Sequence, residues 1–358
     1  MSRIGPIKVL VVEDSAVVRE LLTHILRNDP DLQVIGVAAS GQEAIEMAAR
    51  TRPDLITMDV NMPGINGYEA TRQIMETCPA PIVIVSASYD PQDLAKTFRA
   101  IEAGALAILP PPLGPGHPEF HARANELIRT VKLMSEIKVV RRWPKTPAKP
   151  APRIEIQKTS GKIEVVAMGA STGGPVVLKQ ILEGLGAGFP APVLMVQHMS
   201  PGFVSGLAEW LQQSARFQVQ VAQPREQIKP GQAYLAPDGF HMEVDRFGRI
   251  ELSAGALVNG MRPAISPLLR SVAESYGPNA VGILLTGMGS DGAAELALMK
   301  KKGAFTIAQD KESSVVHGIP GEAIKLGAAM YVMGPEQIAE LLKTLIIQNR
   351  SEPKGKRK

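Results

Sequence analysis

The stretch Val165-Val166-Ala167-Met168-Gly169-Ala170-Ser171-Thr172-Gly173-Gly174-Pro175 is the key to the fold of this 358-residue chain. An apolar run that ends in small residues and a serine is typical of a buried strand that turns sharply into a helix. The glycines leave space around Ser171, and the free N–H groups of the first helical turn point toward any oxyanion formed beside it. The stretch therefore predicts an exposed serine hydroxyl suited to acyl transfer.

Two other interpretations of this stretch are a purely structural turn and a dinucleotide-binding loop. The match to the nucleophile elbow Gly-x-Ser-x-Gly is a weak signal by itself. A dinucleotide fingerprint has glycine at the position of Ser171 and an acid about 20 residues later, at the end of the next strand. The next predicted strand, 191–197, is instead followed by His198. A histidine at a neighbouring strand end favours a Ser/His hydrolase.

A third strand end supplies an acid. The apolar run 281–286 passes through glycines into a predicted helix and places Asp291 at the same sheet edge as Ser171 and His198. These side chains are the complement of a nucleophile, a general base and an orienting acid. Their chain order is Ser, His, Asp, whereas the α/β-hydrolase fold uses Ser, Asp, His, so we reject that fold.

The rest of this half predicts a three-layer α/β/α unit with a mainly parallel sheet. We expect a helix at 201–211, a strand at 304–308 and a helix at 338–347. His241 and His317 could also line the cleft, although neither directly follows an apolar strand.

The N-terminal half alternates strands and helices and predicts a doubly wound parallel sheet. The expected strands are 8–12, 34–37, 55–58, 82–85 and 105–109, and a last helix is expected at 122–140. The polar residues at the strand ends are Glu13, Asp14, Asp59 and Ser86. Three converging carboxylates repel each other unless a hard cation joins them. A Mg²⁺ held by Asp14 and Asp59, with Glu13 acting through water, satisfies this requirement.

Length and charge suggest how the chain is divided. A chain of 358 residues predicts two domains, at 1–130 and 163–348, with a proline-rich linker at 131–162 and a basic tail at 349–358. The whole chain has a net charge of +4. Residues 138–162 carry +7 and residues 350–358 carry +4, so the remaining residues together carry −7. Because the basic groups lie in the linker and the tail, we expect no nucleic-acid partner.

The sequence lacks a long apolar run and contains a single cysteine. No apolar run approaches 18 residues and the N-terminus has no signal-peptide core, so we expect a cytoplasmic protein with no direct membrane insertion. Cys78 is the only cysteine and cannot form an internal disulfide.

The N-terminal half resembles a two-component receiver domain, which has a flavodoxin-like fold. The matching segments are Glu13-Asp14-Ser15, Asp59-Val60-Asn61-Met62-Pro63-Gly64 and Val85-Ser86-Ala87. The resemblance implies that Asp59 is the phosphoacceptor and that Ser86 grips the phosphoryl group. It also implies that Glu13, Asp14, Asp59 and the Asn61 carbonyl bind Mg²⁺.

This half departs from the receiver pattern at the fifth strand. Receivers carry an aromatic residue and a lysine where this chain has Ile108 and Pro111. Proline supplies neither charge nor donor, so the coupling of Asp59 phosphorylation to the rest of the protein is an open question.

The C-terminal half resembles the catalytic domain of the chemotaxis protein-glutamate methylesterases, the CheB family. The matching motifs are Gly169 to Pro175, Val196 to Phe203 and Leu285 to Ala293. The resemblance implies that Ser171, with His198 and Asp291, hydrolyses glutamate methyl esters on methylated chemoreceptors and releases methanol. Deamidation of receptor glutamines is implied as a second activity.

The same resemblance implies the remaining components of the reaction. Backbone N–H groups of Thr172 and Met288 would meet the oxyanion, and the esterase reaction itself would need no cofactor. A chemotaxis histidine kinase would phosphorylate the receiver and so regulate the esterase. The alternatives are an esterase uncoupled from phosphorylation and a non-catalytic signalling adaptor. The receptor, the balance of esterase and deamidase activity, and the oligomeric state do not follow from the sequence.

Overall fold

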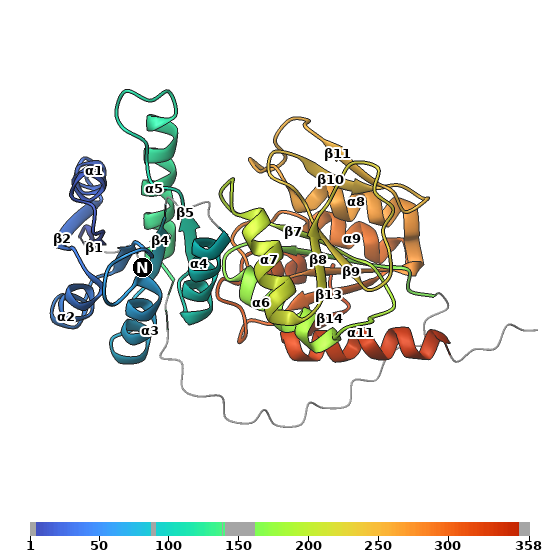
Figure 1. Ribbon diagram of the computed structural model, residues 1–358. Coiled ribbons are helices and arrows are strands. Elements are labelled where there is room, and N and C mark those ends of the chain that lie inside the picture. The colour runs from blue at the N-terminus through green and yellow to red at the C-terminus, as the bar shows by residue number, and fades with distance from the viewer. Residues whose placement is uncertain (1–4, 87–90, 138, 140–161, 351–358) are drawn as a thin grey trace, which may run out of the picture. The chain divides into compact units, whose positions relative to one another are not determined.

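The computed structural model describes residues 5–86, 91–137, 139 and 162–350, and the chain divides into two compact units, 1–149 and 150–358 (Figure 1). Each unit contains one parallel sheet covered by helices on both faces. Among the described residues, no helix combines the length and apolar character needed to cross a membrane.

The first unit is a five-stranded parallel sheet with the order β2-β1-β3-β4-β5. Helices α1 and α5 cover one face, and α2, α3 and α4 cover the other (Figure 1). Its elements are β1 (Ile7–Val12), α1 (Ala16–Arg27), β2 (Leu32–Ala38), α2 (Gly41–Thr51), β3 (Leu55–Met58), α3 (Gly67–Thr77), β4 (Ile82–Val85), α4 (Pro91–Ala103), β5 (Ala107–Leu109) and α5 (Phe120–Ser135). Strand order reverses between β1 and β3, and a ligand site is expected at such a switch point.

The second unit is a seven-stranded sheet with the order β14-β13-β12-β6-β7-β9-β8, in which every pair of neighbours is parallel. Its elements are β6 (Val165–Ala170), α6 (Gly174–Leu185), β7 (Val193–Gln197), α7 (Val204–Ala215), β8 (Gln218–Val221), β9 (Gln232–Leu235), β10 (His241–Val244), β11 (Ile250–Ser253), α8 (Ile265–Tyr276), the 3₁₀ turn η1 (Gly277–Asn279), β12 (Ala280–Leu284), α9 (Ala293–Lys301), β13 (Phe305–Gln309), α10 (Ile319–Lys325), β14 (Tyr331–Met333) and α11 (Pro335–Arg350). The central strand β6 lies between β12 and β7, which places the switch point at its carboxyl end.

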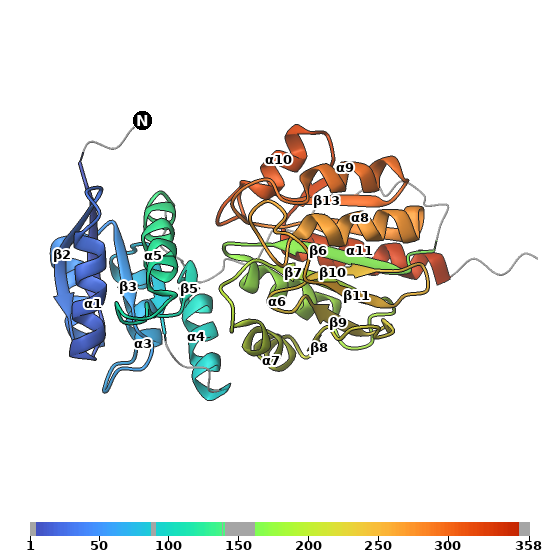
Figure 2. The same cartoon turned by 90° about the horizontal axis from the view of Figure 1, so that it is seen from above.

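Helices cover both faces of this second sheet, and one face also carries a hairpin. Helices α6, α7 and α11 lie on one face, and α8, α9, α10 and the antiparallel β10–β11 hairpin lie on the other (Figure 2). The hairpin interrupts the alternation of strands and helices and packs against α8.

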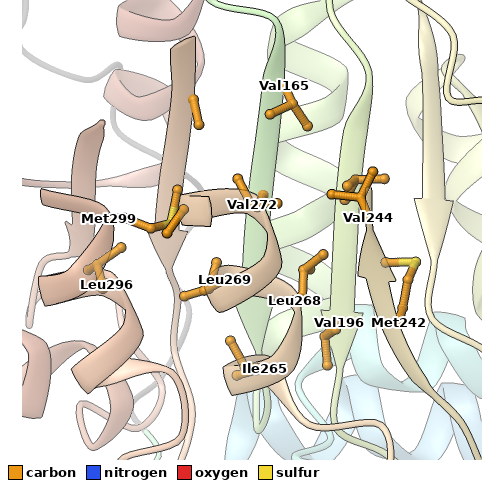
Figure 3. Packing of buried hydrophobic residues seen from close by; sticks show 14 of the residues in the cluster. Val165, Val196, Met242, Val244, Ile265, Leu268, Leu269, Val272, Leu296 and Met299 are labelled. Atoms are coloured by element: carbon orange, nitrogen blue, oxygen red, sulfur yellow. The ribbon is translucent and has the colours of Figure 1, made fainter. Parts of the chain in front are cut away.

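The core between α8 and the sheet supports the switch point. Figure 3 shows Ile265, Leu268 and Val272 of α8 directed toward the strands that carry Val165 and Val196. These side chains are fully buried, and burying a side chain of this size contributes about 2 kcal/mol. The first turn of α8 is therefore firmly held next to the ends of β6 and β7.

The predicted fold class is confirmed, while several element boundaries are wrong. The helix predicted at 201–211 runs from Val204 to Ala215, and the helix predicted at 122–140 runs from Phe120 to Ser135. Residues 138, 140–161 and 351–358 lie outside the described residues, so the domain, linker and tail limits stay predictions. Helix α5 occupies the first five residues of the predicted linker, and α11 continues to Arg350, two residues into the predicted tail. Edge strands β8 and β14 and the β10–β11 hairpin were not predicted, because strands of three or four residues lack a long apolar run.

Candidate functional site

Three neighbouring strands of the second unit end at one place and carry Ser171, His198 and Asp291. Ala170 and Gln197 are register partners on β6 and β7, so Ser171 and His198 follow paired positions. The loop after β12 brings Asp291 to the same edge, where its Oδ2 lies 3.0 Å from His198 Nε2. Both of these side chains are about 95% buried. The structure thus brings the three predicted residues to adjacent strand ends.

The His198 imidazole uses its Nε2 atom toward Asp291. An ionised carboxylate only accepts hydrogen bonds, so the proton of the neutral ring lies on Nε2. The other nitrogen, Nδ1, is buried and has no hydrogen-bond partner among the described residues. In the Ser-His-Asp template the acid binds Nδ1 and the serine uses Nε2, so the ring here is turned the other way round. The base available to a nucleophile is Nδ1.

Asp291 accepts five hydrogen bonds. Its Oδ2 accepts from His198 Nε2 and from the Ile265 N–H at 2.6 Å. Its Oδ1 accepts from Asn259 Nδ2 at 2.9 Å, the Ser266 N–H at 3.2 Å and the Ser266 hydroxyl at 2.6 Å. Burial alone would raise the pKa of Asp291, but the hydrogen bonds from His198, Ser266 and Ile265 outweigh it and hold that pKa well below its usual value. Asp291 is therefore a fixed anion at the N-terminus of α8.

Gln197 joins the backbones of two of the candidate residues. Its Nε2 donates to the carbonyls of Ser171 and His198, each at 2.8 Å. Its Oε1 is buried and has no hydrogen-bond partner among the described residues. A Cβ on Gly174 would lie 2.1 Å from that oxygen, so only glycine allows α6 to begin this close to Gln197.

The loop after β12 lies directly against Ser171. The Ser171 N–H donates to the Thr286 carbonyl at 3.0 Å, so this N–H is not free to meet an oxyanion. A Cβ on Gly287 would lie 2.6 Å from Ser171 Cβ. The predicted oxyanion donors, Thr172 and Met288, are the next residues along these two backbones, and their N–H roles stay predictions.

The segment that carries Asn259 is anchored by His241 and Arg262. His241 is buried, its Nε2 lies 2.9 Å from the Ala256 carbonyl, and its Nδ1 accepts the Ala264 N–H at 3.2 Å. Arg262 donates to the carbonyls of Ala254 and Gly255. His241 thus supports the segment that contacts Asp291.

His317 pairs with Gly287 in an isolated parallel bridge. Its Nδ1 lies 3.3 Å from the Ser314 hydroxyl. Partial burial, together with Lys311, lowers the pKa of His317.

The first unit carries an acidic pocket at its own switch point. Ligand oxygens of Glu13, Asp14 and Asp59 lie within 4.8 Å of one another, and Glu13 and Asp59 are buried. The pocket has a volume of about 320 Å³, and Asn61 and Pro111 also line it. Burial and the nearby Asp59 charge raise the pKa of Glu13 to about 7. Such a crowd of oxygen donors is the set that a hard divalent cation prefers.

Ser86 and the two positions that depart from the receiver pattern lie in the same part of this unit. Ser86 Oγ is buried and has no hydrogen-bond partner among the described residues. Pro111 lines the pocket at the position where the receiver resemblance calls for lysine, and Ile108 is buried. Among the described residues that line the pocket, none is cationic.

Sequence reasoning missed Gln197, Asn259 and Ser266. Gln197 could have been singled out from the sequence, because a polar residue at the last position of a buried strand is unusual. Asn259-Gly260 has the signature of a tight turn, and both residues have positive φ. Nothing in the local sequence indicates that Asn259 and Ser266 bind Asp291.

The two folds and their sites define a response regulator joined to a serine-hydrolase unit. Residues 166–342 match the family model for the CheB methylesterase, and residues 9–117 match the response regulator receiver domain. The chain therefore belongs to the CheB methylesterase family, and its receiver domain precedes the catalytic domain in the sequence.

Relatives match almost the whole chain. A protein-glutamate methylesterase/protein-glutamine glutaminase of Syntrophus aciditrophicus is 56% identical and covers 94% of this chain and 97% of its own. One of the same name from Nitrosospira multiformis is 53% identical and covers 97% and 99%. The crystal structure of the Thermotoga maritima CheB methylesterase catalytic domain is 39% identical with a TM-score of 0.50, and it covers 52% of this chain and all of its own.

Proposed function

We propose that this chain is a phosphorylation-regulated protein-glutamate methylesterase that acts on methylated chemoreceptors and also deamidates their glutamines. The observation that carries the proposal is the buried contact between His198 Nε2 and Asp291 at the strand end beside Ser171. The names of the relatives support the same activities.

In this proposal Ser171 is the nucleophile. Its hydroxyl attacks the ester carbonyl of a methylated glutamate side chain and gives its proton to His198 Nδ1. The Nε2–H group keeps its hydrogen bond to Asp291 throughout. The backbone N–H groups of Thr172 and Met288 receive the oxyanion, and such a donor typically contributes about 3 kcal/mol. The imidazolium then protonates the leaving oxygen, and methanol departs. Water, activated by His198, hydrolyses the acyl-enzyme and restores Ser171.

Deamidation uses the same residues. A glutamine amide in place of the ester loses ammonia when His198 protonates the leaving nitrogen, and the same acyl-enzyme is hydrolysed to glutamate. No metal takes part in either reaction as we propose it.

In the first unit, Asp59 is the proposed phosphoacceptor and a chemotaxis histidine kinase is the proposed donor. Glu13, Asp14, Asp59 and the Asn61 carbonyl would hold Mg²⁺, which would neutralise charge on the transferred phosphoryl group. The cluster of oxygens and the raised pKa of Glu13 support a cation at this place. Ser86 would donate its hydroxyl to a phosphoryl oxygen.

The test is methanol release from a methylated receptor by the full chain, compared with Ser171→Ala. We expect release to require Ser171 and to rise when a small phosphodonor and Mg²⁺ are added. Asp59→Asn should remove the rise while keeping the basal rate. If the wild type releases no methanol under either condition, the esterase proposal fails and the adaptor hypothesis gains support.

A second candidate, an esterase uncoupled from phosphorylation, is favoured by Pro111. A pocket without the lysine has one fewer cation to bind a phosphoryl group. If release requires Ser171 but does not respond to phosphodonor, the uncoupled esterase is the better description. Pro111→Lys would then be expected to restore the response.

A further inference from the structure

The Ser266 hydroxyl lies between the carboxylates of Asp291 and Glu295, and the proposed mechanism gives this hydroxyl no role. Its Oγ is 2.6 Å from Asp291 Oδ1 and 2.8 Å from Glu295 Oε2. Ser266 is 3% exposed and stands in the first turn of α8, while Glu295 stands in the first turn of α9. The contact with Asp291 has the length of a charge-assisted hydrogen bond, and the contact with Glu295 has the length of an ordinary hydroxyl hydrogen bond.

One hydroxyl cannot donate to both carboxylates at once. A serine hydroxyl has a single hydrogen and two acceptor lone pairs. The Gly292 N–H, at 3.1 Å, donates to the same oxygen. If both acids are ionised, one of the two short oxygen–oxygen contacts lacks a hydrogen at any instant. The two carboxylates therefore compete for one proton.

A surface cation acts on this competition. Arg270 Nη2 lies 2.6 Å from Glu295 Oε1, and the arginine side chain is about half exposed while that of Glu295 is mostly buried. Arg270 offsets the negative charge of Glu295 and weakens its pull on the hydroxyl hydrogen. A chain of short contacts thus runs from the surface through Ser266 to Asp291 and on to His198.

The charged groups around this chain of contacts are few. Among the described contacts, His198 bonds to Asp291, and Arg270 bonds to Glu295. The carboxylates of Asp291 and Glu295 are the charged groups in contact with Ser266. Asn259 also donates to Asp291 but carries no charge.

We propose that Ser266 is a positioning residue for the esterase, because its one proton is shared between Asp291 and Glu295 and the Arg270–Glu295 pair thereby sets how strongly Asp291 holds the His198 imidazole. The inference rests on the proposed function only for the role of His198 in catalysis.

The proposal predicts opposite effects for the variants Glu295→Gln and Arg270→Gln. Glu295→Gln removes a negative charge and commits the hydroxyl to Asp291, and both changes weaken the hold on a protonated imidazole. Arg270→Gln leaves Glu295 unopposed and does the reverse. We expect the titration midpoint of the His198 ring to fall by about half a pH unit in Glu295→Gln and to rise by a similar amount in Arg270→Gln.

The measurement is an NMR titration of the imidazole signals in the full chain, with the His198 signal assigned through His198→Gln. In the Ser266→Ala background, the shift caused by Glu295→Gln should shrink to less than half. Ser266→Thr keeps the hydroxyl and should keep the wild-type midpoint. The control is Glu183→Gln, which breaks the Lys179–Glu183 pair on α6 and should move nothing.

The titration needs no turnover, so it tests the inference even if the wild type releases no methanol. Shifts in the same direction, or shifts below about 0.1 unit, would overturn the sharing of the proton. A full Glu295→Gln shift in the Ser266→Ala background would show that Ser266 does not transmit it. Thermal melting of each variant separates these results from loss of fold. Where methanol is released, the acidic limb of the pH–rate profile should move with the NMR midpoint.

Discussion

Asp291→Asn is the substitution that tests the geometry of the site most directly, because it keeps the shape and replaces one acceptor oxygen by a donor. Five donors converge on the two oxygens of Asp291. If the new amide nitrogen faces His198, the ring can shift its proton to Nδ1, and only the Ile265 N–H is left unpaired. If it faces the other way, it meets the donors of Asn259 and Ser266. The first orientation leaves fewer buried donors unpaired and is favoured.

Each buried donor left unpaired costs about 1–3 kcal/mol, so we expect Asp291→Asn to lower the free energy of unfolding of the second unit by about that amount. The cost to the reaction is larger. A proton on Nδ1 prevents that nitrogen from accepting the Ser171 proton, and a wrong tautomer of this kind lowers kcat by roughly 10⁴. That factor corresponds to about 5.5 kcal/mol of transition-state stabilisation.

The assays are methanol release and urea denaturation. The control is Asp245→Asn, the same chemical change at the β10–β11 turn, where one oxygen accepts the N–H groups of Phe247 and Arg249. The control should keep the wild-type rate. If Asp291→Asn retained more than about a tenth of the wild-type rate, the conclusion that Asp291 fixes the proton on His198 Nε2 would be refuted.

Two further predictions concern Gln197 and Glu13. Gln197→Glu sets a carboxylate against the carbonyls of Ser171 and His198, so we expect a loss of about 2 kcal/mol or more in thermal denaturation and a lower kcat. Gln197→Met should cost less, because it also removes the unpaired Oε1, and equal stability of both variants would contradict the assigned contacts. The pKa of Glu13 is raised from 4.5 to about 7, so its contribution to stability is present below pH 4.5 and lost as the pH rises through 7. Without Mg²⁺, calorimetry should show the first unit less stable at pH 8 than at pH 5, by about 1 kcal/mol after allowance for solvent screening. Glu13→Gln should flatten this slope and added Mg²⁺ should oppose it, whereas a slope unchanged in Glu13→Gln would point to another group.

The parallel sheets and their switch points follow from local pattern. Short apolar runs that alternate with amphipathic segments, such as 55–58 and 165–170, specify buried parallel strands. Parallel strands end at one edge, so the polar residue directly after two of the runs identifies Ser171 and His198, and the glycine-rich turn after the run 281–286 leads to Asp291. The β10–β11 hairpin and the edge strands escaped prediction because strands of three or four residues are too short to show a clear alternation.

The contacts that hold the three residues in place depend on the tertiary structure. Asn259 and Ser266 reach Asp291 across 32 and 25 residues of chain, and their own surroundings in the sequence carry no sign of a carboxylate partner. The choice of Nε2 rather than Nδ1 for Asp291 depends on the ring orientation at the end of β7. Amino-acid order alone thus determined which chemical groups stand at the strand ends, because strand periodicity is a local property. Their protonation and partners were decided only by packing, because a buried charge is set by every donor that the fold brings within about 3 Å of it.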